Sequence, residues 1–283
     1  MKAYFELTKP SVTWLILMSA AVGYIFGARG SWEPARILHT LVGIALIASG
    51  TAALNQWVER EADARMRRTQ ARPIPSGRLP ASRAAVFGAL LSVAGFAELF
   101  LAVNPLTGLL GLFTLASYLF LYTPLKRRSP HSTTLGAVPG AMPPLIGYAA
   151  AAGTLSLEAW VLFLILFLWQ FPHFYAIAWM YRDDYARAGI LMLPVVEPDG
   201  RSTARRILLG SLLLIPASVA PSLLSMAGPL YAAGALLLGL LYLAAGVRIW
   251  LEHSAPRARG VLLASVVYLP FLYGLLVWDR LPV

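Results

Sequence analysis

The chain has 283 residues, of which 58% are hydrophobic and only 13% are charged, and its formal net charge is +10. Soluble domains carry about a quarter of their residues as charges, so this composition favours a helix bundle embedded in lipid. The sequence contains no cysteine. This excludes disulfides, thiolate metal sites, thioether-linked heme and cysteine nucleophiles, and leaves carboxylates, amides, imidazoles and tyrosines for any chemistry.

Nine apolar runs follow one another along the chain, with lengths close to that needed to cross a hydrocarbon core of about 30 Å. They fall at roughly 11–28, 36–57, 84–103, 107–122, 135–152, 157–178, 206–226, 229–250 and 260–277. Lys2 and Lys9 precede the first run, as in a signal peptide, but no A-x-A cleavage site follows it. We therefore interpret it as a retained first helix.

Short breaks with proline or glycine separate several runs, as at Asn104-Pro105 and Gly228-Pro229, and they predict tight hairpins. The run 135–152 itself contains three prolines, which predicts a kinked helix lining a cavity. The expected fold is an all-α integral membrane protein, a bundle of about nine transmembrane helices. It forms a single polytopic domain over residues 1–283, with the lipid bilayer as its surroundings.

The basic residues alternate between the two sides of this predicted bundle. Of the 23 lysines and arginines, 20 lie in the N-terminal tail and in the connections after the second, fourth, sixth and eighth runs. The other side holds only Arg29, Arg36 and Arg280. Cytoplasmic loops are the basic ones, so the N-terminus is predicted to be cytoplasmic and the C-terminus to lie outside. Topology thus explains the net charge without a nucleic-acid partner.

A first acidic stretch follows the second run. Asn55, Glu59 and Asp63 are spaced i, i+4, i+8, so they share one face, about 6 Å apart per step, if the second helix continues past the membrane. Mg²⁺ prefers such oxygen ligands and completes its shell with water and phosphates. Arg68 and Arg72 follow and match phosphate oxygens. The pattern indicates a site for a metal-bridged diphosphate, although a solvated helix end with i,i+4 ion pairs has the same spacing.

A second acidic stretch follows the sixth run, where Asp183 and Asp184 precede Tyr185 and Arg187. Adjacent carboxylates repel each other unless a cation is near, so a second magnesium or Arg187 would relieve them. A simple loop is the alternative interpretation. Seven of the 13 acidic residues lie in these two stretches, both on the predicted cytoplasmic side. Their shared side favours a joint role over two unrelated loops.

Between these stretches lies the sequence Y-T-P-L-K-R-R, from Tyr122 to Arg128. Lys126 and Arg128 are candidates for holding a diphosphate. Positive-inside topology alone would also place basic residues here.

Longer patterns resemble a known family. The motif N-x-x-x-E-x-x-x-D-x-x-M-x-R-T-x-x-R-P at 55–73 is similar to the first aspartate-rich motif of UbiA-type prenyltransferases, and its second half resembles the heme O synthase branch. Three further stretches resemble the same branch: D-Y-x-x-A-G-x-x-M-L-P-V at 184–195, P-H-F at 172–174 and L-T-K-P at 7–10. These motifs are spread over most of the chain.

The resemblance implies transfer of the farnesyl group of farnesyl diphosphate to a vinyl group of protoheme IX, giving heme O, with Mg²⁺ activating the diphosphate. It implies catalytic and metal-binding roles for Asn55, Glu59, Asp63, Asp183 and Asp184. The candidate substrate-binding residues are Arg68, Arg72, Lys126, Arg128, Tyr122, Tyr185 and His173. His173, near the cytoplasmic end of the sixth run, is a candidate iron or propionate contact, with a hydrogen-bonded packing histidine as the alternative.

The sequence departs from the general UbiA pattern at two points. Glu59 stands where aspartate is usual, which keeps the ligand oxygens on a longer side chain. The second motif, usually D-x-x-x-D, is compressed here to the adjacent Asp183 and Asp184.

Three other functions are alternatives to this one. A sibling prenyltransferase acting on an aromatic acid or quinone precursor would share the magnesium motifs. A transporter is disfavoured, because the acids gather on one side and not at the midplane. A CDP-alcohol phosphotransferase is rejected, because the stretch 199–205 has one residue too many and lacks the trailing acids.

The resemblance also sets the expected surroundings. The expected location is the cell (inner) membrane, with the active site facing the cytoplasm. Farnesyl diphosphate and protoheme are the expected substrates, and a downstream heme-modifying or oxidase-assembly protein is a candidate partner.

Overall fold

The computed structural model describes residues 1–30 and 33–282, and its regular structure in these ranges is helical. In chain order the elements are α1 (Lys2–Leu7), α2 (Pro10–Gly27), α3 (Pro34–Arg65), α4 (Ala81–Ala97), η1 (Glu98–Val103), α5 (Pro105–Ala116), η2 (Ser117–Tyr122), α6 (Thr123–Leu125), α7 (Ser132–Gly140), α8 (Met142–Ala152), α9 (Leu157–Met180), α10 (Arg182–Arg187), α11 (Leu193–Val196), α12 (Arg201–Leu223), α13 (Pro229–Leu251) and α14 (Ala255–Trp278). The π-helical turns η1 and η2 continue α4 and α5 without a break.

Within the described ranges, nine helical segments are long and apolar enough to cross a membrane. They are α2, α3, α4 with η1, α5 with η2 and α6, α7 with α8, α9, α12, α13 and α14. This confirms the predicted all-α architecture and its nine spans. The second span is longer than its apolar run, because α3 continues to Arg65, which is the extension that the spacing of the first acidic stretch required.

Proline and asparagine mark the starts of several helices. Four helices begin with a proline in their first turn, namely Pro10, Pro34, Pro105 and Pro229. Backbone N–H groups in the first turn have no carbonyl partner within the helix, so the missing N–H of proline costs no hydrogen bond there. Asn104 caps α5 by accepting a hydrogen bond from the Thr107 backbone N–H at 2.9 Å. The predicted hairpins at Asn104-Pro105 and Gly228-Pro229 are therefore turns between spans.

The fifth span is interrupted in the middle, where its prolines predicted a kink, while the cavity that this helix was expected to line stays a prediction. α7 ends at Gly140 and α8 begins at Met142, with Pro139 before the break and Pro143 after it. Beside the break, Gln170 of α9 donates a hydrogen bond to the Ala137 carbonyl at 2.9 Å. A neighbouring helix thus supplies an additional polar contact close to the point where the span is interrupted.

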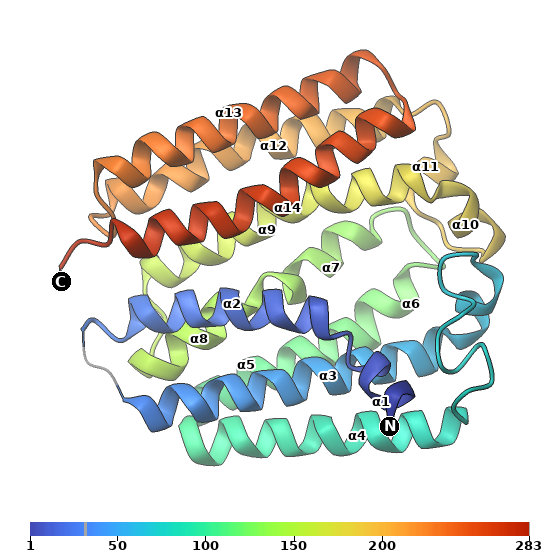
Figure 1. Ribbon diagram of the computed structural model, residues 1–283, viewed down its shortest axis with the longest axis horizontal. Helices are drawn as coiled ribbons and strands as arrows, with labels where there is room; N and C mark the ends of the chain where they lie inside the picture. Colours follow the sequence, from blue (N-terminus) through green and yellow to red (C-terminus); the bar gives the residue numbers. More distant parts are fainter. Residues whose placement is uncertain (31–32, 283) are drawn as a thin grey trace.

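The spans run side by side along the long axis of the molecule (Figure 1). α2 packs on α8, α3 packs on α4, and α9 lies against both α12 and α14. Leu145, Leu162 and Ile165 are fully buried in the shared core. The connections after α3, α6 and α9 gather with α1 at one end, and the C-terminus lies at the opposite end (Figure 1). The two acidic stretches are therefore brought to the same end of the bundle.

Two glycines allow α2 and α8 to approach closely. A methyl group on Gly147 of α8 would overlap the carbonyl oxygen of Ala20, and one on Gly23 of α2 would overlap the carbonyl oxygen of Pro144. Small residues at such positions are the usual means by which membrane helices pack backbone against backbone. This contact holds the first span against the broken fifth span.

Candidate active site

The continuous helix α3 places Asn55, Glu59 and Asp63 in a row on one face, as the i, i+4, i+8 spacing predicted. Asn55 is 2% exposed and Asp63 is fully buried, while Glu59 is half-buried. A solvated helix end would leave all three in water. Their burial therefore favours a built site over the surface ion pairs that the spacing alone also allowed.

The loop after α3 folds back over this row. Nη1 of Arg72 donates to both carboxylate oxygens of Asp63, at 2.9 and 2.7 Å. The Thr69 hydroxyl donates to the Asp63 backbone carbonyl at 2.9 Å and fixes the turn. The buried carboxylate is thus paired with a guanidinium that keeps further N–H donors for an anion.

The end of the fourth span supplies the second cation. Nζ of Lys126 lies 2.8 Å from Oε1 of Glu59 and 4.4 Å from the ring centre of Tyr122. Asn55 donates to the Thr123 hydroxyl at 3.3 Å. Burial alone would lower the pKa of Lys126, but the oxygen of Tyr122 and the carboxylate of Glu59 outweigh it and hold that pKa above its usual range. Lys126 therefore remains a cation in this site.

Asp184 connects the second acidic stretch to the first. Its carboxylate accepts hydrogen bonds from the backbone N–H groups of Arg67 at 3.4 Å and Arg68 at 3.2 Å. It also forms an ion pair with Arg187. The cation that relieves this carboxylate in the structure is thus Arg187, one of the two candidates that the sequence left open.

Asp183 points away from its neighbour. Its side chain is 84% exposed, and its nearest cation is Arg182 at 3.9 Å. Adjacent residues on the short helix α10 project in different directions, so the two carboxylates do not form a pair. The predicted metal-binding role of Asp183 gains no support from this geometry and stays a prediction.

Arg68 is held over an aromatic pair. Its Nη2 donates to the Tyr185 hydroxyl at 3.1 Å, and its guanidinium carbon lies 4.8 Å from the ring centre of Tyr181. Arg128 is exposed, and within the described ranges it forms no ion pair with an acidic side chain. The structure therefore places Arg68, Arg72 and Lys126 at the cluster and leaves Arg128 at its margin.

His173 lies apart from this cluster, on the face of α9 that meets α14. Its Nδ1 lies 2.7 Å from the Ser265 hydroxyl oxygen, and its ring stacks on Trp169 with ring centres 4.6 Å apart. These contacts match the packing alternative. They involve only one ring nitrogen, so a role for His173 in acceptor binding stays a prediction.

Three contributors were not predicted from the sequence: Thr69, Thr123 and Tyr181. Two of them lie inside quoted motifs, Thr69 in R-T-x-x-R-P and Thr123 in Y-T-P, and both are buried. A buried threonine in a polar stretch is the signal that could have identified them. Tyr181 carries no such signal, because interfacial tyrosines are common in membrane proteins.

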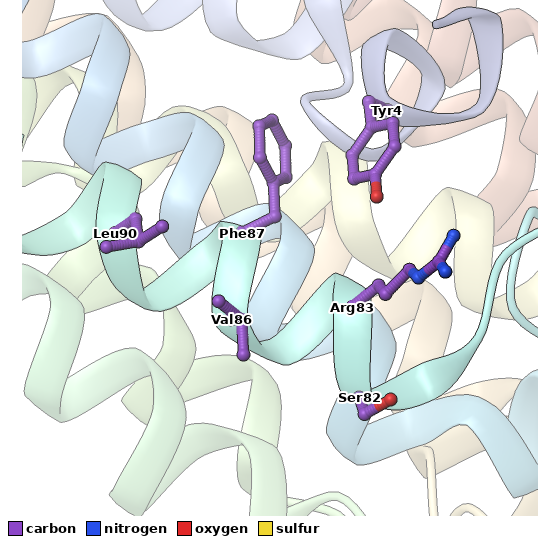
Figure 2. Close-up of a pocket in the computed structure, with 6 residues that line it drawn as sticks. All are labelled: Tyr4, Ser82, Arg83, Val86, Phe87 and Leu90. Atoms are coloured by element: carbon purple, nitrogen blue, oxygen red, sulfur yellow. The ribbon is translucent and has the colours of Figure 1, made fainter.

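A hollow of about 550 Å³ lies elsewhere, lined by residues of α1 and α4. It is lined by Tyr4, Ser82, Arg83, Val86, Phe87 and Leu90. Figure 2 shows Tyr4 next to Phe87 in this lining, and their ring centres are 5.0 Å apart. None of the predicted site residues lines this hollow, so the chemistry is to be sought at the charged cluster.

The donor set of the cluster fits a magnesium–diphosphate pair. Asn55, Glu59, Asp63 and Asp184 offer oxygen atoms, which Mg²⁺ prefers. Over residues 1–30 and 33–282, no three acidic or imidazole side chains converge on one point. Three of these four residues are instead carboxylates paired with a base. Each carboxylate offers oxygen atoms of the kind that Mg²⁺ takes as ligands, and each base offers N–H donors of the kind that phosphate accepts.

Comparison with known proteins covers nearly the whole chain. Residues 16–275 match the UbiA prenyltransferase family. A protoheme IX farnesyltransferase of Solibacter usitatus is 63% identical, over 99% of each chain. Another, of Koribacter versatilis, is 48% identical and aligns over 99% of this chain and 94% of that protein.

Solved structures share the fold at low identity. The structure described for digeranylgeranylglyceryl phosphate synthase superposes with a TM-score of 0.81 at 18% identity, over 98% of this chain and 97% of that one. A UbiA homologue from Archaeoglobus fulgidus bound to GPP and Mg²⁺ superposes with a TM-score of 0.68 at 16% identity, over 97% and 99%. The predicted UbiA-like fold is thereby confirmed.

Proposed function

The chain belongs to the UbiA prenyltransferase family, and we propose that it transfers the farnesyl group of farnesyl diphosphate to a vinyl group of protoheme IX, giving heme O and diphosphate. The observation that carries the proposal is the 63% identity, over both full lengths, to a protoheme IX farnesyltransferase. The paired carboxylates and bases at one end of the bundle support a site for the diphosphate part of the substrate.

We propose Mg²⁺ as the cofactor, held by Asn55, Glu59, Asp63 and Asp184. When bound, it would neutralise the charge that develops on the departing diphosphate. The support is the oxygen donor set described above and the Mg²⁺ bound by the Archaeoglobus fulgidus homologue. Asp183 is included as a further ligand on the family resemblance alone.

The chain's own residues hold the diphosphate and favour its departure. Arg72, Lys126 and Arg68 donate hydrogen bonds to its oxygens, whose negative charge grows as the allylic C–O bond breaks. The ring of Tyr122, already in contact with an ammonium group, presents a π face that also suits an allylic cation. The vinyl carbon then forms the new C–C bond, and water adds to the resulting cation and releases a proton, leaving a hydroxyethyl group.

We further propose that the protein lies in the inner membrane with this site facing the cytoplasm. The basis is charge: the end of the bundle that holds the site also holds the basic connections, and such connections stay on the cytoplasmic side. Farnesyl diphosphate and protoheme would reach the site from this side. A downstream heme-modifying or oxidase-assembly protein is a candidate recipient of the product.

A sibling prenyltransferase is the second candidate, because the same fold is shared by a structure described for digeranylgeranylglyceryl phosphate synthase.

Expression in a host without its own heme O synthase, followed by chromatography of extracted hemes, tests the proposal. Heme O is the expected product. Parallel reactions with farnesyl diphosphate and protoheme, 4-hydroxybenzoate or a naphthoate separate the two candidates. Prenylation of an aromatic acid but not of heme would leave only the sibling.

A further inference from the structure

Lys9, in the L-T-K-P stretch, has a backbone conformation that residues other than glycine rarely adopt. It forms the junction between α1 and α2 with φ 47° and ψ 62°, in the left-handed region. Pro10 follows it, and a residue before proline normally takes an extended conformation. The surrounding structure must therefore hold Lys9 in place, and strain held in this way is often associated with a functional site.

The segment before Lys9 is fixed to the active-site helix. Gln56, the neighbour of Asn55 on α3, donates a hydrogen bond to the Leu7 carbonyl at 3.0 Å. The Leu7 side chain is fully buried against the apolar cluster at the start of α4. Glu6 forms a two-point ion pair with Arg78, at 3.0 and 2.7 Å. These contacts attach α1 to α3 and to the loop that carries Arg72.

The side chain of Lys9 is half-buried beside the charged cluster. It lies within electrostatic range of Glu59, Asp63, Arg72 and Lys126. Burial, and then the two neighbouring cations, lower the pKa of Lys9 to about 8. In the part of the chain that the structure describes, neither carboxylate forms an ion pair with Lys9, because each is already paired with another base.

The local charges therefore do not balance. Three cations, Lys9, Arg72 and Lys126, are matched by two carboxylates, Glu59 and Asp63, which leaves an excess of positive charge among side chains that are largely buried. A diphosphate carries several negative charges and oxygen atoms that an ammonium group can reach as a point donor. The negative charge of a diphosphate therefore complements the excess positive charge of the cluster.

We propose that Lys9 is a further diphosphate-binding residue, presented to the site by the left-handed junction and by the docking of α1. The inference rests on the proposed function, since it takes the diphosphate substrate from it. It adds the N-terminal segment to the site. It also gives a role to the L-T-K-P motif at 7–10, for which the family resemblance implied none.

The experiment measures binding of inorganic diphosphate with MgCl₂ to the purified, detergent-solubilised protein by calorimetry. Lys9→Gly removes the ammonium group while glycine accepts the positive φ, and Lys9→Arg keeps the charge. Lys2→Met, on the exposed face of α1, is the matched control. We expect Lys9→Gly to weaken binding about tenfold or more, as for a lost charge-assisted hydrogen bond. Lys9→Arg should stay within about threefold of wild type by the same reasoning, and Lys2→Met should bind like wild type.

A second measurement uses the unaltered protein and avoids any effect of substitution on folding. An amine-reactive reagent, read out by mass spectrometry, should modify Lys9 more slowly when Mg²⁺ and diphosphate are present, while Lys2 reacts at an unchanged rate. Wild-type affinity in Lys9→Gly, equal losses in Lys9→Gly and Lys9→Arg, or unprotected Lys9 would each overturn the inference. Neither measurement involves heme, so absence of heme O in the host assay would refute the proposed acceptor without touching Lys9.

Discussion

Asp63 is the most deeply buried carboxylate of the site, and its two oxygens are both bonded to Arg72. Asp63→Asn keeps the shape and one acceptor oxygen but removes the charge that a metal needs. We expect heme O formation to fall by at least about a hundredfold, the scale on which single electrostatic contacts to a transition state act. Product chromatography from membranes checks this, with size-exclusion elution as the test of folding.

Glu61→Gln is the matched control for that substitution, because Glu61 lies on the same helix and is exposed, with Arg60 at 3.5 Å as its ion-pair partner. It should leave product formation unchanged, since exposed pairs contribute little. Near-normal activity of Asp63→Asn would remove the central claim about this site. Asn55→Ala and Asp184→Asn are expected to act in the same direction as Asp63→Asn.

His173 gives a separate prediction about the acceptor. If Nε2 of His173 contacts heme, His173→Ala should shift the Soret band of bound protoheme or weaken its affinity by about tenfold. Ser265→Ala is the matched control, because it leaves the imidazole in place and removes the hydrogen bond to Nδ1 together with the one that the Ser265 hydroxyl donates to the Leu262 carbonyl. Optical titration of both purified variants distinguishes the roles. Heme binding like wild type in His173→Ala would assign the residue to packing against Trp169 and Ser265.

At the scale of elements, the positions and lengths of the apolar runs were sufficient to predict the membrane spans. The break of the fifth span followed from its prolines, and the extension of α3 followed from the spacing of its polar face. The return of the loop after α3, which brings Arg72 to Asp63, could not be predicted, because it depends on tertiary contacts such as Thr69 with the Asp63 carbonyl. The divergence of Asp183 and Asp184 depends on the direction of α10, which no local pattern sets.

The contact between α2 and α8 gives a prediction about stability. Gly147→Ala would force a methyl group onto the Ala20 carbonyl, and backbone cannot move aside as a flexible side chain can. We expect destabilisation of about 1–3 kcal/mol, the range for an overpacked interior. Thermal unfolding in detergent checks this. Gly260→Ala in α14, where a methyl group meets nothing within 4 Å, should leave the unfolding temperature unchanged or raise it. Equal stability of both variants would contradict the close packing.

At the scale of the whole molecule, the two ends of the bundle differ both in the connections that they hold and in their charge. The structure places α1 and the connections after α3, α6 and α9 at one end, and the sequence puts most basic residues and both acidic stretches there (Figure 1). The sequence alone could assign residues to this end through alternating loops. It could not bring Asp184 to the backbone of Arg67 and Arg68, because that contact joins residues more than a hundred positions apart.

Orientation in the membrane is the prediction that belongs to this scale. Nine spans in the described ranges, an odd number, put the two termini on opposite sides, and the positive-inside rule puts the N-terminus in the cytoplasm. A reporter inserted in the connections 66–80 or 188–192 should therefore be cytoplasmic. One placed at 153–156, which holds no basic residue, or at the C-terminus should lie outside. A paired alkaline phosphatase and fluorescent-protein assay reads both sides. A cytoplasmic C-terminus in a fusion that still makes heme O would contradict both the number of spans and the side assigned to the active site.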